Sequence, residues 1–268
     1  MLTTLQGIVL KFDDPKEFAE ILRTKRIGIY NLGPGIGDHV YHTYFPEVYY
    51  KNVGRKVVDL NKKWCYDFNP YVERDQPVDI AICPWGINDR LPKRSMLAVS
   101  EFIFKPLGFK IDLRHPRLYK FEDIKTIPNR ICIHTTGKSS NFSLSDSVIE
   151  QIEKNYKGYE IIQIGGKNDK QTPFIDKRGL ENIWDTVKII ASSSVFIGVN
   201  SGLYHIANAY PRVWKKIVLA DTLHTFDDLK DWTPLNPNYK NGFWNDLSTM
   251  YFNLSENDIG ITYSYRKI

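Results

Sequence analysis

Three adjacent residues, Asn200-Ser201-Gly202, follow a short apolar segment and precede a helical pattern that contains His205. The apolar segment, residues 195–199, is typical of a strand covered on both faces. Polar and small residues between a strand and a helix can cap the helix and direct free backbone N–H groups towards an anion. A βα turn in any α/β protein has the same pattern, so the residues alone leave both interpretations open.

Residues 33–38 (GPGIGD) form a second cluster, where a strand pattern gives way to a helical one. Glycines at such a turn let the backbone approach a ligand closely. Their spacing differs from the dinucleotide-binding fingerprint, and no Gly-Lys-Ser/Thr follows as it would in a P-loop. Asp38 ends the cluster, and its carboxylate suits either a helix cap or a catalytic base.

Two further strand patterns end in residues that suit a diphosphate. Thr135, Thr136 and Lys138 follow one of them, and hydroxyls with a lysine at the carboxyl edge of a strand can bind phosphate oxygens. Gly165-Gly166-Lys167 closes the next strand, where glycines would leave space for a nucleotide and the lysine would face its phosphates. A solvated loop lysine accounts equally well for Lys138, and glycine is common in such turns.

Alternating strands and helices must position these clusters. The strand patterns are residues 26–30, 56–60, 79–83, 130–135, 160–165, 195–199 and 216–220. The helical patterns are residues 15–23, 95–108, 145–155 and 180–190, with two more that start near residues 39 and 203. This order is typical of βαβ units on a parallel sheet, and it occurs twice.

We therefore predict an α/β protein with two Rossmann-like lobes, residues 1–128 and residues 129–268, joined by a hinge-like segment at residues 119–129. Ligands of such lobes bind at the carboxyl ends of the strands. From about residue 222 the pattern dissolves, and we predict only packing against the second lobe and a return towards the first.

The composition indicates a folded protein of the cytoplasm. Hydrophobic residues make up 42% and aromatic residues 13%, which is enough for a substantial core. No apolar run approaches a membrane span, and residues 1–12 lack a signal-peptide layout. The three cysteines are far apart, which favours reduced thiols. A net charge of +5 suits a phosphate-bearing ligand or an acidic membrane surface, although a solvated basic face is the commoner cause.

The first of these clusters also resembles a known signature. Residues 198–207 read Gly-Val-Asn-Ser-Gly-Leu-Tyr-His-Ile-Ala. This order is similar to the donor-site signature of the heptosyltransferase-like glycosyltransferases, family 9, in which Asn-Asp-Thr-Gly-Pro-Met-His-Leu-Ala follows a strand. Gly37-Asp38, before a helix that runs on to Pro46, resembles the first loop of that family, and the turns at residues 133–140 and 164–167 resemble two others.

The resemblance implies a GT-B fold whose lobes face a central cleft. The C-terminal lobe would hold a nucleotide-diphospho-sugar through the residues named above, His205 included, and the N-terminal lobe would present a glycan or glycolipid acceptor. A sugar, heptose or a related hexose, would be transferred with inversion. Asp38 would act as the base, and the helix terminus at Ser201 would stabilise the leaving diphosphate. No Asp-x-Asp motif is present, so neither a metal ion nor a cofactor is expected.

The acceptor side would involve Gly35, Gly37, His39 and His42. The two histidines lie one helical turn apart and could also suggest a metal pair, but the sequence shows no third ligand at a suitable spacing. Packing among aromatic residues is the other interpretation. The resemblance further implies polysaccharide biosynthesis in the cytoplasm, with peripheral contact at the inner membrane face.

The chain also departs from the family pattern. Asn200 stands at the usual aspartate, Ser140 at a lysine, and Phe142-Ser143 at a Trp-Pro pair, so Lys138 would have to supply the missing charge. Two alternatives therefore stay open. One is a GT-B enzyme acting on a protein, a capsule chain or a modified nucleobase, since the aromatic content and basic balance leave nucleic acid open. The other is a sugar-nucleotide-binding protein with weakened catalysis.

Overall fold

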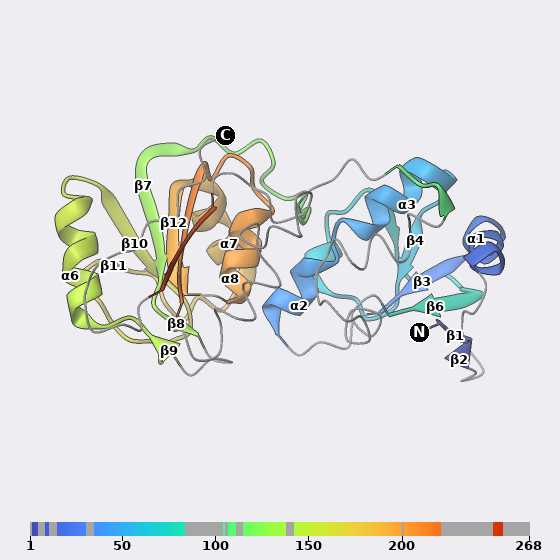
Figure 1. Ribbon diagram of the computed structural model, residues 1–268, viewed down its shortest axis with the longest axis horizontal. Helices are drawn as coiled ribbons and strands as arrows, with labels where there is room; N and C mark the ends of the chain where they lie inside the picture. Colours follow the sequence, from blue (N-terminus) through green and yellow to red (C-terminus); the bar gives the residue numbers. More distant parts are fainter. Residues whose placement is uncertain are drawn as a thin grey trace. The chain divides into compact units, whose positions relative to one another are not determined.

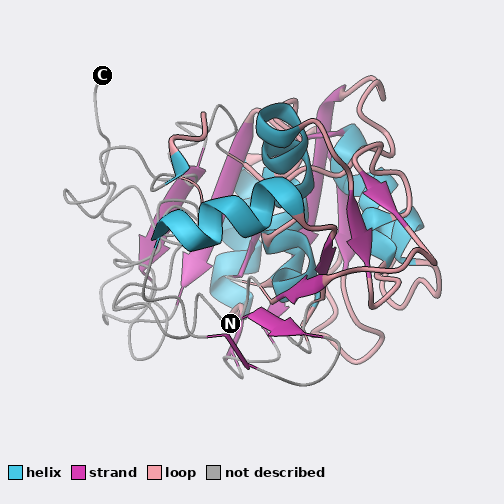
Figure 2. Ribbon diagram, turned by 90° about the vertical axis from the view of Figure 1, so that its right-hand side faces the viewer, coloured by secondary structure: helices cyan, strands magenta, loops and turns pink. Residues whose placement is uncertain are grey.

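The computed structural model describes residues 2–4, 9–10, 15–30, 35–83, 104, 107–110, 115–137, 142–199, 201–220 and 249–253. These residues form two compact units, each with its own six-stranded sheet (Figure 1). The first contains the described residues up to 120, and the second contains those of 121–220 and 249–253. Figure 2 shows the strands in magenta with the helices, in cyan, packed beside them. Most of the predicted helix at residues 95–108 lies outside the described residues.

The N-terminal unit has a mostly parallel sheet with the strand order β2-β1-β6-β3-β4-β5. Its strands are β1 (Leu2–Thr4), β2 (Val9–Leu10), β3 (Ile27–Ile29), β4 (Val57–Asp59), β5 (Val72–Glu73) and β6 (Ile80–Ile82). β6, β3, β4 and β5 are parallel, whereas β1 pairs antiparallel with both β6 and β2. The sequence did not predict β1 or β2, because strands this short carry no readable alternation.

The helices of this unit are α1 (Pro15–Thr24), α2 (Ile36–Tyr41) and α3 (Phe45–Val53), with a 3-10 turn, η1 (Trp64–Tyr66). The single helix predicted from residue 39 is therefore two helices. Pro46 lies in the first turn of α3, where its missing N–H costs nothing, and α3 ends at Gly54 with a positive φ of 76°. Buried aromatic side chains of α3 form much of the core, with Phe45 4.9 Å from Phe104 between ring centroids.

The C-terminal unit has an entirely parallel sheet with the order β11-β10-β7-β12-β13-β14. Its strands are β7 (Ile127–His134), β10 (Glu160–Ile164), β11 (Ile175–Asp176), β12 (Ser193–Val199), β13 (Lys215–Ala220) and β14 (Thr249–Asn253). β8 (Thr136–Gly137) and β9 (Phe142–Ser143) form a small antiparallel pair. β14 falls in the segment for which the sequence predicted no architecture.

Helices α6 (Asp146–Asn155), α7 (Ile183–Ser192) and α8 (Gly202–Asn208) belong to the C-terminal unit. α6 starts after Ser145, whose hydroxyl accepts the N–H of Val148. α7 starts later than its apolar pattern predicted, because the side chain of Asn182 accepts the N–H of Trp184 and caps the helix there.

Alternate residues of the central strands point to opposite faces of this sheet. Ile131 and Ile133 of β7 belong to an apolar cluster that also contains Ile149 of α6. On β12, Phe196 lies on the other face, where its ring centroid is 6.4 Å from that of Tyr204 of α8. By the same alternation His134, at the end of β7, points to the side of α8.

The described residues divide between Lys120 and Phe121, whereas the sequence placed the boundary after residue 128. Phe121 packs edge-on against Trp184 of α7, with the ring centroids 6.3 Å apart. The guanidinium of Arg212 also donates to the carbonyl of Ile124. The segment before β7 therefore belongs to the C-terminal unit. Within the described residues, no helix combines the length and apolar character needed to span a membrane.

Candidate functional site

The central strands of the C-terminal sheet end at one level. His134 of β7 is in register with Ile164 of β10 on one side and with Gly198 of β12 on the other. Because the strands are parallel, the segments after them share one edge of the sheet, as predicted. Gly165 follows β10 there, and Ser201 precedes α8.

A chain of hydrogen bonds links three side chains at this edge. Nδ1 of His134 is 2.9 Å from Oγ of Ser201, and Nε2 of His134 is 3.1 Å from Oδ2 of Asp169. The same carboxylate oxygen accepts the N–H of Gly166 at 2.7 Å. His134 and Asp169 are only 6% and 5% exposed, whereas Ser201 is half-buried.

These contacts define which groups donate. An ionised carboxylate can only accept, so Nε2 of His134 carries a proton when Asp169 is ionised. In the neutral imidazole, Nδ1 is then an acceptor, and the hydroxyl of Ser201 donates to it. Ser201 is the N-cap residue of α8, yet its side chain makes no capping hydrogen bond. The predicted cap is therefore replaced by the contact with His134.

Only glycine fits at position 165, beside His134 and Asp169. Its φ is +134°, and a Cβ there would lie 2.2 Å from Oδ2 of Asp169 and 2.8 Å from Cδ2 of His134. The sequence interpretation was that Gly165 leaves space for a nucleotide. In the structure, the protein's own carboxylate and imidazole lie against the position that a Cβ of residue 165 would take.

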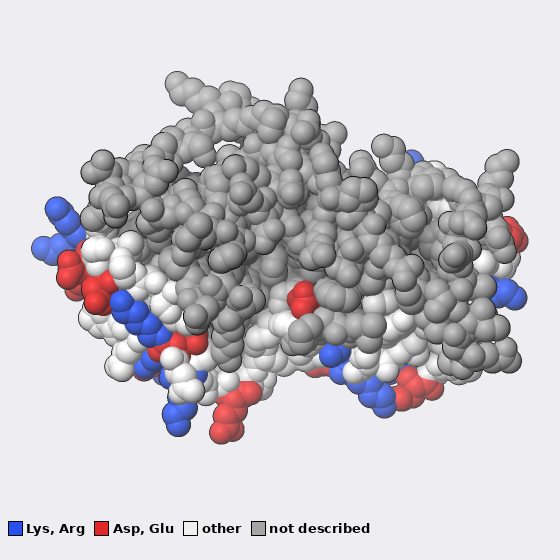
Figure 3. Space-filling model, turned by 60° about the horizontal axis from the view of Figure 1, so that its bottom comes forward, with Lys and Arg blue, Asp and Glu red and all other residues white. Residues whose placement is uncertain are grey.

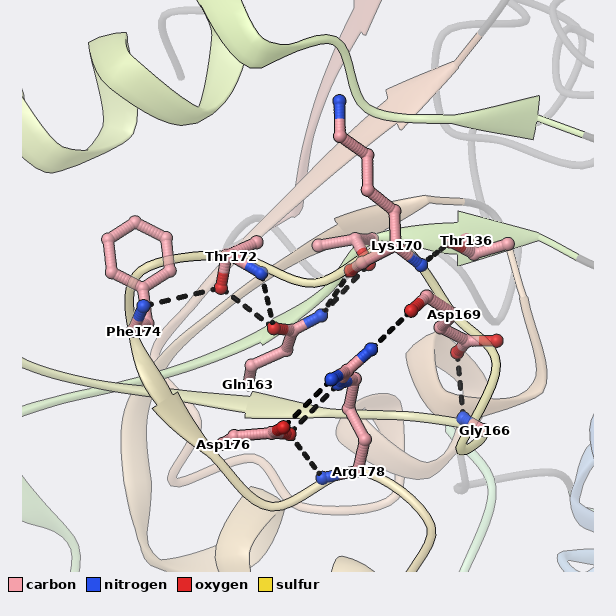
Figure 4. Close-up of polar contacts among 10 residues, drawn as sticks. Thr136, Gln163, Gly166, Asp169, Lys170, Thr172, Phe174, Asp176 and Arg178 are labelled. Carbon is pink, nitrogen blue, oxygen red and sulfur yellow. Dashed lines mark hydrogen bonds and ion pairs between the residues drawn. The ribbon is translucent and has the colours of Figure 1, made fainter.

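The two predicted donor-binding threonines hold the loop that carries Asp169. Figure 4 shows Thr136 beside Lys170 of this loop. Thr135 is fully buried, and its hydroxyl donates to the carbonyl of Lys170 at 2.8 Å. The hydroxyl of Thr136 accepts the N–H of Lys170 at 3.0 Å. Gln163 completes the network, since its amide oxygen accepts from the backbone N–H and the hydroxyl of Thr172. Both threonines thus contact protein in the structure.

Charged side chains also brace this loop. Arg178 donates to the carbonyl of Asp169 and forms an ion pair of 2.8 Å with Asp176. Hydrogen bonds from Arg178 lower the pKa of Asp176 to about 2. The ammonium of Lys170 lies 2.8 Å from a carboxylate oxygen of Asp146 on α6. The segment after β10 is therefore tied to the rest of the unit at several points.

The remaining predicted donor residues lie on α8, on the loop after β10, or outside the described residues. Gly202 opens α8 and His205 lies within it, where burial lowers the pKa of His205 to about 4, so its ring is neutral near pH 7. Lys167 is exposed after β10. Asn200 and Lys138 lie outside the described residues.

In the N-terminal unit, Asp38 lies in the first turn of α2, after the carboxyl end of β3. Its Oδ2 accepts the N–H of Gly35 at 3.0 Å, which satisfies one of the free donors of the helix terminus. Gly37 lies beside it within α2. The geometry therefore shows the capping contact that was one of the two interpretations of Asp38.

His42 is 1% exposed and lies at the end of α2, with its ring edge-on to Tyr41. Burial lowers the pKa of His42 to about 3, and neither ring nitrogen has a hydrogen-bond partner among the described residues. As folded, His42 offers no surface to an acceptor. His39 is half-buried, and its carbonyl accepts from the thiol of Cys65. Among the described residues, no three His, Cys, Asp or Glu side chains are grouped as ligands for a metal ion.

His134 and Asp169 were absent from the predicted site. One signal was available for His134, because it is a polar residue at the end of the otherwise apolar pattern ICIH. Nothing in the sequence connects it with Asp169, which lies 35 residues further on. Their contact is a product of the parallel register of β7 and β10.

The visible surface carries no pattern that identifies a partner. In Figure 3, the Lys and Arg side chains on the coloured part of this face are interspersed with Asp and Glu. Such mixing is typical of a solvated surface. The predicted contact with an acidic membrane therefore gains no support from the described part of this face.

Comparison with solved structures identifies the fold. No family model matches the chain, and no curated protein matches it in sequence. A family 9 glycosyltransferase from Veillonella parvula DSM 2008 superposes with a TM-score of 0.59 at 11% identity, over 87% of each chain. The chain has the fold of this glycosyltransferase. The predicted α/β architecture with parallel sheets, of the GT-B class, is confirmed.

Two Escherichia coli structures are less similar. The ADP-heptose lipopolysaccharide heptosyltransferase II has a TM-score of 0.49 at 12% identity, over 78% of this chain and 87% of that one. The iron-containing dodecameric glycosyltransferase TibC from enterotoxigenic strain H10407 has a TM-score of 0.44 at 17% identity, over 73% of this chain and 60% of TibC.

Proposed function

We propose that this protein is a glycosyltransferase that moves a sugar from a nucleotide-diphospho-sugar to an acceptor hydroxyl. One observation carries the proposal. The segment with the signature order, β12 through Ser201 into α8, lies at the carboxyl edge of a parallel sheet, in a chain with the fold of a family 9 glycosyltransferase. Ligands of α/β proteins bind at this edge.

The reaction is a displacement at the anomeric carbon. The acceptor oxygen forms a bond to that carbon from one face, while the bond to the diphosphate breaks on the other face and the configuration inverts. Asp38 takes the proton of the acceptor hydroxyl. Backbone N–H groups near Ser201 and the lysines of the C-terminal unit meet the charge of the departing diphosphate. We propose that this occurs without a metal ion, because the sequence contains no Asp-x-Asp motif.

A donor screen tests the proposal. ADP-, GDP-, UDP- and CDP-sugars are added separately, and the melting temperature is followed. A ligand that binds only the folded protein raises it, and at a concentration a hundred times its Kd contributes about 2.7 kcal/mol. We expect one nucleotide to stabilise the protein and release of its nucleoside diphosphate to persist in EDTA. Activity that EDTA abolishes and Mn²⁺ or Mg²⁺ restores would contradict the metal-free mechanism.

A second candidate is a sugar-nucleotide-binding protein with weakened catalysis. It is favoured by the hydroxyls of Thr135 and Thr136, which contact protein, and by Asn200, which stands where family 9 has an aspartate. Donor hydrolysis without an acceptor separates the two, since a pure binding protein releases no nucleoside diphosphate. We further propose a glycan or glycolipid as the acceptor, and binding to anionic vesicles tests the proposed membrane contact.

A further inference from the structure

Ser201, His134 and Asp169 connect the edge of the proposed donor site to a buried carboxylate. The half-buried hydroxyl of Ser201 contacts one nitrogen of His134, and the other nitrogen contacts Asp169. Packing alone does not require such an arrangement, because apolar side chains could fill the same volume without any hydrogen bonds to satisfy.

We propose, on the basis of the function proposed above, that His134 is a positioning residue that takes up one proton from solvent when a diphosphate binds. The proton is added at Nδ1 of His134, which changes from acceptor to donor. The hydroxyl of Ser201 then accepts from His134 and donates its own proton to a phosphate oxygen.

The hydrogen-bond inventory gives the reason. In the neutral state, Asp169 holds the proton of His134 at Nε2, so the hydroxyl of Ser201 donates inward to Nδ1 and can offer a ligand only lone pairs. Lone pairs repel phosphate oxygens, which are acceptors themselves. Protonation reverses the bond between His134 and Ser201 and adds a positive charge near the diphosphate, and Asp169 stabilises that charge.

Two other charged side chains described on the loop after β10 form ion pairs elsewhere. On the loop after β10, Lys170 pairs with Asp146, and Arg178 pairs with Asp176 while it donates to the carbonyl of Asp169. Lys167 of the same loop packs its stem against Gly179.

Two described elements beside β7, the strand β12 and the helix α8, place no charged group against His134. β12 (SSVFIGV) contains no titratable residue. On α8, burial lowers the pKa of His205 to about 4, so that ring stays neutral above about pH 5. Asp169 is then the charged group that contacts the ring of His134.

Calorimetric titration with ADP-, GDP-, UDP- and CDP-glucose tests the proposal. The diphosphate of these probes is esterified at both ends and keeps its charge near pH 7, unlike a terminal phosphate with its pKa near 6. Repeating the titration in buffers of different ionisation enthalpy counts the protons taken up. We expect a net uptake of up to one proton per ligand, with affinity rising by up to about tenfold for each unit by which the pH falls.

Three variants locate that proton. His134→Asn should abolish the uptake. Asp169→Asn should reduce it, because the amide oxygen can still accept from Gly166 while the charge that stabilises the imidazolium is lost. Ser201→Ala removes only the hydroxyl, and the ratio of wild-type to variant affinity should grow as the pH falls. His115→Asn is the control, because this histidine belongs to the other unit and should leave the uptake unchanged.

The outcomes separate the two proposals. If His134→Asn does not fold, the Asp169 and Ser201 variants carry the test. Binding without proton uptake, or a pH-independent ratio for Ser201→Ala, overturns the role of His134 and leaves the glycosyltransferase proposal standing. If none of the four nucleotide sugars binds, both proposals fail.

Discussion

At the scale of single residues, Asp38 has an observed contact and a proposed role. Its carboxylate accepts the N–H of Gly35 at 3.0 Å, which stabilises the start of α2. The proposed role is to deprotonate the acceptor. The two are compatible, since the second carboxylate oxygen is a separate acceptor, and a substitution that preserves the cap can separate them.

Asp38→Asn is that substitution. The amide oxygen of Asn can still accept from Gly35, whereas the amide is no base, so kcat should fall by roughly 10²–10⁴-fold with little change in donor affinity or melting temperature. Steady-state kinetics and thermal unfolding measure these quantities. Retained turnover would assign the base to another residue, and a lowered melting temperature would mean that the carboxylate serves α2.

Asn200 is one of the positions at which the chain departs from the family 9 pattern that it resembles. An aspartate there would place a like charge near the diphosphate, so Asn200→Asp should weaken nucleotide-diphosphate binding by about 1 kcal/mol. Asn200→Ala should cost a similar amount through a lost hydrogen bond. Calorimetric titration of both variants tests this. Unchanged affinity in both would remove Asn200 from the site, and faster transfer by the aspartate variant would identify a weakened enzyme.

At the scale of elements, the turn after β10 requires a residue without a side chain, Gly165. Gly165 has a φ of +134° and lies against Asp169 and His134, whereas Gly158 has a φ of +87° and a Cβ added there would meet nothing within 4 Å. Both glycines adopt backbone conformations that L-residues rarely adopt. They differ in the space around them, which makes them a matched pair.

Gly165→Ala should therefore lower the free energy of unfolding by about 2–4 kcal/mol, since backbone strain and overpacking add. Gly158→Ala should cost about 1–2 kcal/mol, from the backbone alone. Urea-induced unfolding compares the two variants. Equal losses would show that the loop after β10 yields easily, and the contact between His134 and Asp169 would then not constrain the turn.

At the scale of the whole molecule, each unit buries a neutral histidine. Burial lowers the pKa of His42 to about 3 in the N-terminal unit and that of His205 to about 4 in the C-terminal unit. Both values lie below the pKa of about 6.5 of an unfolded chain. The unfolded state therefore binds more protons in mild acid, and the stability present above about pH 6.5 is lost as the pH falls towards these values.

Each histidine should lower the free energy of unfolding by up to about 1.4 kcal/mol for each unit by which the pH falls within that window. His42→Phe, which retains a ring beside Tyr41, should flatten the pH dependence by that amount. Urea-induced unfolding at about pH 7, 6 and 5 provides the measurement. An unaltered slope in His42→Phe would mean that the ring is hydrated or paired in solution.

The sequence by itself determined the order of elements in both units. Apolar runs and helical periodicities predicted the central strands and most helices to within a few residues, because burial of an amphipathic face depends on local spacing. It also predicted that Ser201 and Gly165 follow strand ends at one edge of the second sheet, and that Asp38 follows a strand of the first.

Only the tertiary structure decided which side chains meet at that edge. The register of β7 with β10 brings His134 to Asp169 across 35 positions of sequence, and the turn into α8 adds Ser201. Thr135 and Thr136 were correctly placed after β7, but their hydroxyls contact the backbone of Lys170. Spacing along a chain determines which face a residue occupies, whereas its hydrogen-bond partner depends on segments that approach from elsewhere in the fold.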